Sequence, residues 1–427
     1  MGPDLSHLTR VVTGLGLGLG TAAAGVTGIT SRSRSLADEV ENVEATYAHL
    51  CDEERVVVSE DGTVLHVEVD LPTDLDPARP VVVLSHGYTL STKAWIFVRR
   101  RLKDAGYEVV CWDQRGHGRS GAGSRDSYRI DVLGRDLRAV VDETCAGRTF
   151  ALVGHSMGGM TQMGFGRQFP ELVRERCVAV AFVATSSGGQ GEDRVALGDL
   201  LGRAAQRLGP YALAPLTGRQ AVVEQARRVA RQLEHFFTYR YSFASPVPPS
   251  LLHYASDMIM STPVEVMQGF LRTLSEHDER EALASFAGIE ALVVNGDCDL
   301  MLPPSHSERI VRRLPGAEHV VVSDAGHLLM LEHPEVVSDQ ILAMLERAAR
   351  HEPLGERTRV QVTDLAHRRT SRSRRHQAER REQRRRAREQ VELATEQTRA
   401  ELARQAQRVV RGRRASGSTR VTEEDPS

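Results

Sequence analysis

The chain has 427 residues, of which 41% are hydrophobic, so it is long enough to bury a sizeable core. Its net charge of −2 conceals a division, because residues 1–350 carry −10 whereas residues 351–427, with 20 Arg against 12 acidic residues, carry +8. The five cysteines are scattered and lack the spacing of zinc ligands. The cysteines imply no disulfide framework and fit a reducing compartment best. The sequence shows no metal-binding cluster and no cofactor loop, so we expect neither a metal nor a cofactor.

Residues 1–52 are predicted to form a Gly-rich leader and linker. Residues 11–30 carry no charge, but they contain six Gly and four Thr. Only half of this stretch is apolar, whereas a membrane-spanning helix needs about 20 mostly apolar residues. The alternatives are a membrane or export segment and a leader with neither role. We expect a cytoplasmic protein, with membrane association through this N-terminal segment as the alternative.

Residues 53–70 predict two strands joined by the turn Asp61-Gly62. From residue 81 onward, short apolar runs alternate with amphipathic stretches near 92–105, 131–145, 157–168, 305–313 and 335–349. This alternation is typical of a parallel sheet buried on both faces. We therefore expect an α/β fold with a mostly parallel, eight-stranded sheet and helices on both faces. The apolar runs are Val81–Leu84, Glu108–Trp112, Phe150–Val153, Val178–Val183, Ala291–Val294 and His319–Val322.

The α/β pattern is interrupted between residues 186 and 275, where the sequence is mostly helical in pattern. We expect these residues to form an inserted helical cap between two parts of the core, residues 53–185 and 276–350. Insertions at the carboxyl ends of parallel strands can form lids over an active site.

Residues 351–427 are predicted to be an Arg-rich tail, either disordered or a solvated helix. Residues 367–414 hold 17 Arg and six Glu, with almost no large apolar residue before Val391. Such a tail could contact a membrane or another anionic surface. Nucleic acid is the less favoured partner. The chain uses Arg for nearly every basic residue and has only two Lys, but codon bias in a GC-rich genome accounts for this usage, so Arg abundance is poor evidence for phosphate recognition.

The strongest chemical signal is the segment Gly154-His155-Ser156-Met157-Gly158, which follows an apolar run and precedes a helix-forming stretch. A strand, G-x-S-x-G and a helix in this order form a turn that holds the serine in a strained backbone conformation and exposes its hydroxyl. The Met157 amide at the helix N-terminus could bind an oxyanion. We expect Ser156 to be a nucleophile.

A nucleophilic serine needs a base, and the base needs a carboxylate that orients it. His327 follows the last apolar run, at the expected sheet edge, and is a better candidate than His333, which precedes a proline. Asp297 and Asp299 both follow the run before it, so either could be the acid.

The loop after Val81–Leu84 could provide a second oxyanion donor. It reads Ser85-His86-Gly87-Tyr88, in which Gly87 permits close approach and the Tyr88 amide could point at the oxyanion. We interpret His86 as structural.

These segments resemble, in order, the motifs of the α/β-hydrolase superfamily, over roughly residues 53–350. The resemblance implies a triad of Ser156, Asp299 and His327, with oxyanion amides from Tyr88 and Met157. The family pattern Gly-x-x-Asp-x-x-x-Pro selects Asp299 over Asp297. The matching segments are His86-Gly87, Asp113–Ser120, Gly154–Gly159, Gly296–Pro303 and Gly326-His327.

The strand-to-helix turn at Gly154–Gly158, called the elbow below, carries a serine. The dehalogenases and epoxide hydrolases of the superfamily have a nucleophilic aspartate at this position, which distinguishes this chain from them. The core looks most like the esterase, lysophospholipase and monoacylglycerol-lipase branch. The resemblance implies hydrolysis of a small-molecule carboxylic ester through an acyl-enzyme. The alternatives are cleavage of a thioester or a carbon–carbon bond, acyl transfer and, in another class, a protein that binds nucleic acid or membrane through its tail.

The predicted cap indicates an apolar or lipid-like acyl group, because apolar and aromatic residues usually line small-molecule pockets. The alternative is that these side chains pack the core of the cap itself. They are Phe236, Phe237, Tyr239, Tyr241, Phe243, Met258, Met260 and Met267, with Met160 and Met163 after the elbow.

Overall fold

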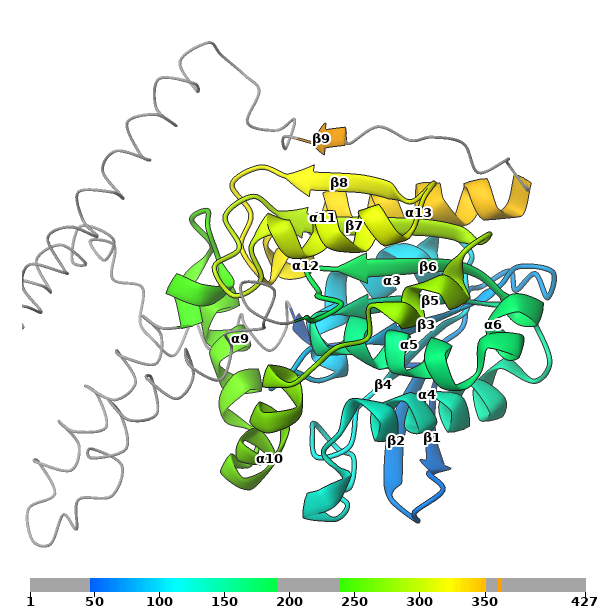
Figure 1. The fold of residues 1–427 in the computed structure, drawn as a ribbon, viewed down its shortest axis with the longest axis horizontal. Helices are drawn as coiled ribbons and strands as arrows, with labels where there is room; N and C mark the ends of the chain where they lie inside the picture. Colours follow the sequence, from blue (N-terminus) through cyan, green and yellow to red (C-terminus); the bar gives the residue numbers. More distant parts are fainter. Residues whose placement is uncertain (1–46, 190–237, 351–359, 363–427) are drawn as a thin grey trace, which may run out of the picture. The chain divides into compact units, whose positions relative to one another are not determined.

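The computed structural model describes residues 47–189, 238–350 and 360–362 (Figure 1). The expectations for the leader, for much of the cap and for nearly all of the Arg-rich tail lie outside these residues.

A single sheet organises the described residues. Its nine strands have the order β1-β2-β4-β3-β5-β6-β7-β8-β9. The β1–β2 hairpin is antiparallel and β2 pairs antiparallel with β4, whereas all later pairs are parallel. The strands are β1 (Glu53–Val58), β2 (Val64–Asp70), β3 (Val81–Ser85), β4 (Val109–Trp112), β5 (Phe150–His155), β6 (Cys177–Val183), β7 (Glu290–Gly296), β8 (Glu318–Val322) and β9 (Val360–Val362).

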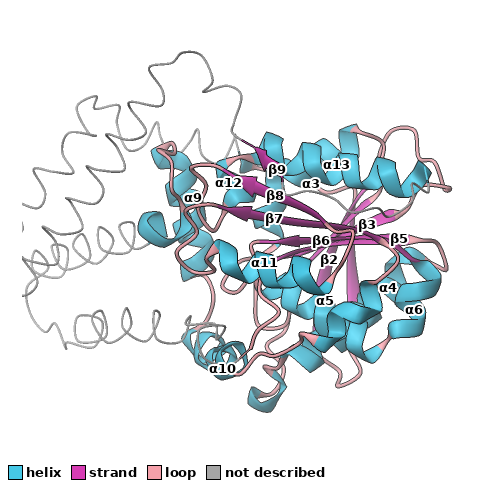
Figure 2. Cartoon of the chain, turned by 45° about the horizontal axis from the view of Figure 1, so that its top comes forward, coloured by secondary structure: helices cyan, strands magenta, loops and turns pink. Residues whose placement is uncertain are grey.

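Helices cover both faces of this sheet (Figure 2). Successive side chains of a strand point to opposite faces. Val82 and Leu84 of β3 accordingly pack in one buried cluster, which also holds residues of α3 and α13, while Val81 and Val83 pack in another with residues of α4 and α11. The helices are α3 (Ile96–Asp104), α4 (Ile130–Cys145), α5 (Met157–Gln168), α6 (Pro170–Arg176), α9 (Pro249–Met260), α10 (Val264–Ser275), α11 (Pro304–Arg313), α12 (Leu329–Glu332) and α13 (Pro334–Arg350), with 3-10 turns η2 (Thr92–Trp95), η3 (Arg125–Ser127) and η5 (Glu281–Phe286).

The predicted fold class is confirmed, and the structure adds elements that the sequence did not indicate, among them α6, α12 and β9. The short helix α6 follows α5 after a single residue, so the two had no separate signal. Strand β9 pairs in parallel with β8. The expectation of a tail without strands is therefore wrong at residues 360–362, where the otherwise free edge of β8 provides backbone hydrogen-bonding groups.

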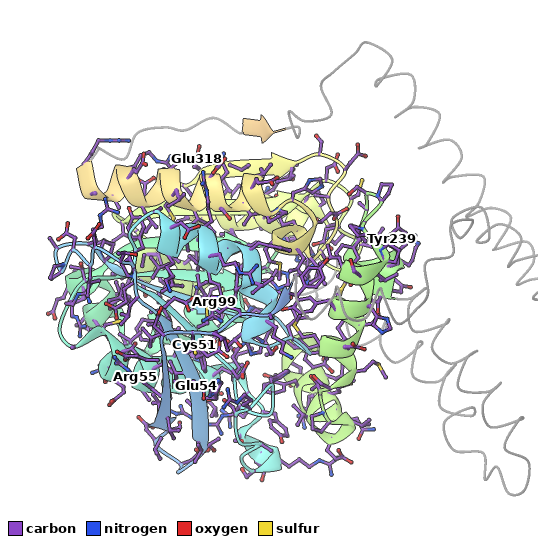
Figure 3. All side chains as sticks on the ribbon, turned by 180° about the vertical axis from the view of Figure 1, so that it is seen from behind. Cys51, Glu54, Arg55, Arg99, Tyr239 and Glu318 are labelled. Carbon is purple, nitrogen blue, oxygen red and sulfur yellow. The ribbon has the colours of Figure 1, made fainter. Side chains whose placement is uncertain are left out.

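A buried arginine ties α3 to the hairpin (Figure 3). Arg99 is 2% exposed, and its Nε and Nη2 donate to the two carboxylate oxygens of Asp70 at 2.6 and 3.0 Å. Its Nη1 also donates to Glu68. Burial opposes ionisation of Glu68, but its hydrogen bond to His66 and the charge of Arg99 outweigh burial and lower its pKa to about 2.

We expect Arg99→Ala to lower the free energy of unfolding by about 3–5 kcal/mol, because it leaves the fully buried Asp70 carboxylate without its main partner. Urea denaturation followed by circular dichroism measures the change. Arg101→Ala on the same helix is the matched control, because Arg101 pairs at 3.4 Å with Asp339 and both side chains are more than half exposed. Its loss is expected to be about 0–1 kcal/mol. Equal losses in the two variants would contradict this account of Arg99.

Candidate active site

Ser156 lies on the turn between β5 and α5. Its φ of 53° and ψ of −117° are unusual for a residue with a side chain. The turn is held by its backbone, because the Ser156 amide donates to the Val183 carbonyl at 3.0 Å and the Ser156 carbonyl accepts the Thr185 hydroxyl at 2.6 Å. Strain of this kind persists only where surrounding contacts impose it.

Two glycines make the turn possible. A Cβ on Gly154 would lie 2.6 Å from the backbone of Gly158, and a Cβ on Gly158 would lie 2.1 Å from the carbonyl oxygen of Ser85. Neither distance is compatible with a side chain. The first turn of α5 can therefore lie directly against the end of β3.

The loop after β3 passes beside Ser156. A Cβ on Gly87 would lie 3.2 Å from the Ser156 Cβ, so the backbone just before Tyr88 is close to the elbow. His86 shapes this loop, because its Nδ1 donates to the Gly87 carbonyl at 2.7 Å and its Nε2 accepts the Gln114 amide at 2.9 Å. Burial lowers the pKa of His86 to about 4, so the imidazole is neutral at pH 7.

Asp299 and His327 form a buried pair. Nδ1 of His327 lies 2.8 Å from Oδ2 of Asp299, and the residues are 4% and 3% exposed. The other oxygen, Oδ1, accepts the amides of Met301 and Leu302 at 2.8 and 2.9 Å. These contacts fix the carboxylate, and a proton on Nδ1 leaves Nε2 of His327 as an acceptor.

Asp297 and His333, the alternative candidates for the acid and the base, make other contacts. Oδ1 of Asp297 accepts the amide of Asp324 at 2.8 Å, so Asp297 shapes the turn that precedes the His327 loop. Nε2 of His333 lies 3.3 Å from the carbonyl oxygen of Asp324. Neither contact involves the Asp299–His327 pair.

His155 links the elbow to the His327 loop. Its Nε2 lies 3.0 Å from the His327 carbonyl oxygen, and the two ring centroids are 4.8 Å apart. Burial lowers the pKa of His155 well below its usual value, so the ring is neutral and donates from Nε2. His327 is thereby tethered to the residue next to Ser156. The sequence analysis did not identify this contact, because its partners are 172 residues apart.

Glu332 fixes the other side of the His327 loop and was also missed. Its Oε2 accepts the Gly326 amide at 2.6 Å, and its Oε1 accepts the Ala244 amide at 2.8 Å and the Ser245 hydroxyl at 2.7 Å. One partly buried carboxylate thus joins the histidine loop to the start of the described part of the predicted cap. No local pattern indicates this role, because the partners are up to 88 residues away.

The cap residues that the sequence singled out have different environments. Phe243 and Met258 are buried in a cluster with strand residues of the core, and Met267 packs with Tyr88 and Met157. Met260 is 57% exposed. Phe236 and Phe237 lie outside the described residues. Some of these side chains therefore join the cap to the core beside Ser156.

Within the parts of the chain that the structure describes, no group of three or more His, Cys, Asp and Glu residues could hold a metal ion. No helix among them has both the length and the apolar character that crossing a membrane requires.

Known proteins share this organisation. The chain is 26% identical to a 2-hydroxy-6-oxononadienedioate/2-hydroxy-6-oxononatrienedioate hydrolase of Burkholderia vietnamiensis, over 68% of this chain and 95% of that protein. It is 36% identical to epoxide hydrolase B of Mycobacterium tuberculosis, over only 30% of this chain and 35% of that protein. These relatives support a hydrolase enzyme that acts on small molecules.

The solved structure of an esterase from Thermogutta terrifontis has a TM-score of 0.53 and 22% identity, over 69% of this chain and 99% of that one. This likeness concerns the fold. The sequence profile described as "alpha/beta hydrolase fold" matches residues 80–334. This range includes the turn at Ser156, the loop after β7 that carries Asp299 (the acidic loop) and the loop after β8 that carries His327 (the histidine loop). The chain belongs to the α/β-hydrolase family.

Proposed function

We propose that this hydrolase cleaves carboxylic esters, with Ser156 as nucleophile, His327 as base and Asp299 as the acid that orients the base. The main support is the 2.8 Å contact between Asp299 and Nδ1 of His327, on a loop tethered through His155 to the residue beside Ser156. A carboxylate that holds Nδ1 of an imidazole leaves Nε2 to accept a serine proton.

In the proposed reaction, Nε2 of His327 takes the Ser156 proton while the serine oxygen attacks the ester carbonyl. The tetrahedral oxyanion is bound by the amides of Tyr88 and Met157. His327 then protonates the leaving alcohol, and the acyl group stays on Ser156. Water, deprotonated by His327, attacks the acyl-enzyme, and the same steps release the acid and restore the serine.

The proposed oxyanion site rests on two backbone segments. Met157 is the first residue of α5, where amides lack helical partners and the helix dipole favours negative charge. The close approach of Gly87 to Ser156 brings the Tyr88 segment to the same place.

The substrate class is proposed to carry an apolar acyl group. The third buried cluster contains Tyr88 and Met157 together with Met160 after the elbow, Leu302 after the acid, and Phe270 of α10. The surroundings of the proposed oxyanion site are therefore apolar, as in most pockets for small molecules.

Other reactions of a serine nucleophile are the alternatives. The name of the Burkholderia vietnamiensis relative identifies a hydrolase of unsaturated oxo-dioates, which keeps carbon–carbon cleavage under consideration. Thioester cleavage and acyl transfer use the same groups. A substrate panel separates these reactions, and an added alcohol that outcompetes water as acyl acceptor identifies a transferase.

Replacement of the nucleophile tests the proposal directly. We expect Ser156→Ala to reduce kcat on nitrophenyl esters by roughly 10⁶, as in triads where the serine has been removed. It should also abolish labelling by a fluorophosphonate. Ser275→Ala on α10 is the control and should retain both properties. Wild-type esterase activity in Ser156→Ala would refute the mechanism.

The two aspartates after β7 provide a second test. We expect Asp299→Asn to lower kcat by about 10⁴, because an amide no longer stabilises the required tautomer and the imidazolium. Asp297→Asn keeps a side-chain oxygen that can accept the Asp324 amide, and it should change kcat less than tenfold, on the scale of a 1.4 kcal/mol effect. Steady-state kinetics on one ester compare the two variants. A larger loss of kcat in Asp297→Asn than in Asp299→Asn would show that Asp297, not Asp299, is the acid.

Acyl-chain preference tests the substrate class. Each methylene buried in an apolar pocket contributes about 0.8 kcal/mol, so kcat/KM should rise about fourfold per methylene until the pocket is full. A series of nitrophenyl esters from acetyl to decanoyl, corrected for spontaneous hydrolysis, measures this slope. Fastest turnover of the acetyl ester would count against an apolar acyl site.

A further inference from the structure

Tyr88 connects the loop of the proposed oxyanion site to a helix of the cap. On the basis of the proposed function, we propose that the Tyr88 side chain is a positioning residue: its contact with α10 sets the place of the Tyr88 amide, so that the oxyanion site is complete only when this cap helix is seated. This positioning role of the Tyr88 side chain is distinct from the hydrogen bond that the Tyr88 amide is proposed to donate to the oxyanion.

The contact with α10 is specific. The Tyr88 hydroxyl donates to the carbonyl oxygen of Met267 at 2.7 Å. Tyr88 is 8% exposed, and burial raises the pKa of its phenol, so the hydroxyl keeps its proton and remains a donor. A carbonyl oxygen has two lone pairs, so Met267 can accept this bond in addition to a bond within the helix.

Packing reinforces the hydrogen bond. Tyr88 and Met157, which carry both proposed oxyanion amides, belong to one buried cluster with Val266, Phe270 and Leu274 of α10. Both proposed oxyanion segments therefore share an apolar cluster with this one helix.

Helix α10 packs closely against the core. A Cβ on Gly269 would lie 2.1 Å from the ring of Tyr128, and a Cβ on Gly116 would lie 2.6 Å from Val266. These close approaches fix the helix laterally against the core. The Met267 carbonyl consequently has a defined position when α10 is in place.

The backbone can transmit this position to the amide. Gly87 lies against His155 and Ser156, and Thr89 has a left-handed φ of 60°. Tyr88 is held between these two restrained residues, and a tyrosine side chain has only two rotatable bonds, so a ring fixed at its hydroxyl limits where its Cα can lie. A misplacement of about 1 Å at an active site can cost 10²-fold in rate.

Tyr88→Phe tests the inference, because it removes the hydroxyl and keeps the amide and the ring. We expect kcat to fall about 10- to 100-fold with KM within about twofold of wild type, because the contact acts on the oxyanion site. The rate of fluorophosphonate labelling of Ser156 should fall in parallel. Steady-state kinetics on a single nitrophenyl ester and stopped-flow labelling measure both quantities in the full chain.

Tyr254→Phe is the matched control. Tyr254 lies on the other described cap helix, α9, and its hydroxyl donates to the carbonyl oxygen of Lys93 at 3.0 Å. This variant loses an equivalent bond between cap and core, so kcat should stay within about twofold of wild type. Equal losses of kcat in the two variants, or a change confined to KM in Tyr88→Phe, would overturn the inference.

A second variant covers the case in which Tyr88→Phe does not fold. Phe270→Leu leaves the Tyr88 hydroxyl bond in place but weakens the packing of α10, and it should lower kcat and the rate of fluorophosphonate labelling; an unchanged kcat would overturn the inference. Ser156→Ala separates the two proposals. If that variant is active, the proposed function fails, whereas an inactive Ser156→Ala together with wild-type kcat in Tyr88→Phe defeats only the role of Tyr88.

Discussion

The close approach of α5 to the end of β3 is the constraint on which the rest of the site depends. Only a glycine at position 158 allows it, because any side chain there would overlap the Ser85 carbonyl. With the helix so close, the strained Ser156 lies beside the loop that carries Gly87 and Tyr88. Parallel strands that end at one edge then bring the acidic loop after β7 and the histidine loop after β8 to the same place.

The hydrogen-bond partners of the buried histidines near Ser156 distinguish their roles. His86 and His155 have depressed pKa values and are neutral, so each presents one fixed donor to a backbone carbonyl. His327 instead faces the Asp299 carboxylate. In the proposed mechanism only His327 acquires charge, because only its partner stabilises an imidazolium. The neutral rings of His86 and His155 hold the Gly87 and His327 loops in place through these hydrogen bonds.

The described part of the predicted cap contacts two loops of the proposed site. Residues 242–245 are bonded to the histidine loop through its backbone and through Glu332, and α10 contacts the loop of the proposed oxyanion site through Tyr88. Both loops of the proposed machinery therefore contact the insertion. Such an arrangement makes the catalytic geometry sensitive to the position of the cap, as in enzymes whose lids complete the catalytic constellation.

Local sequence patterns by themselves determined the α/β class, the strands from residue 53 to residue 322 and the elbow at Ser156, because strand periodicity, turn residues and G-x-S-x-G act over a few neighbouring residues. They left Asp297 and Asp299 equivalent until a family resemblance separated them. Only the tertiary structure decided which aspartate contacts His327, that His155 and Glu332 hold the histidine loop, and that Tyr88 reaches Met267. These contacts join residues far apart in the chain, and their partners are set by strand order and helix packing, which no local pattern encodes.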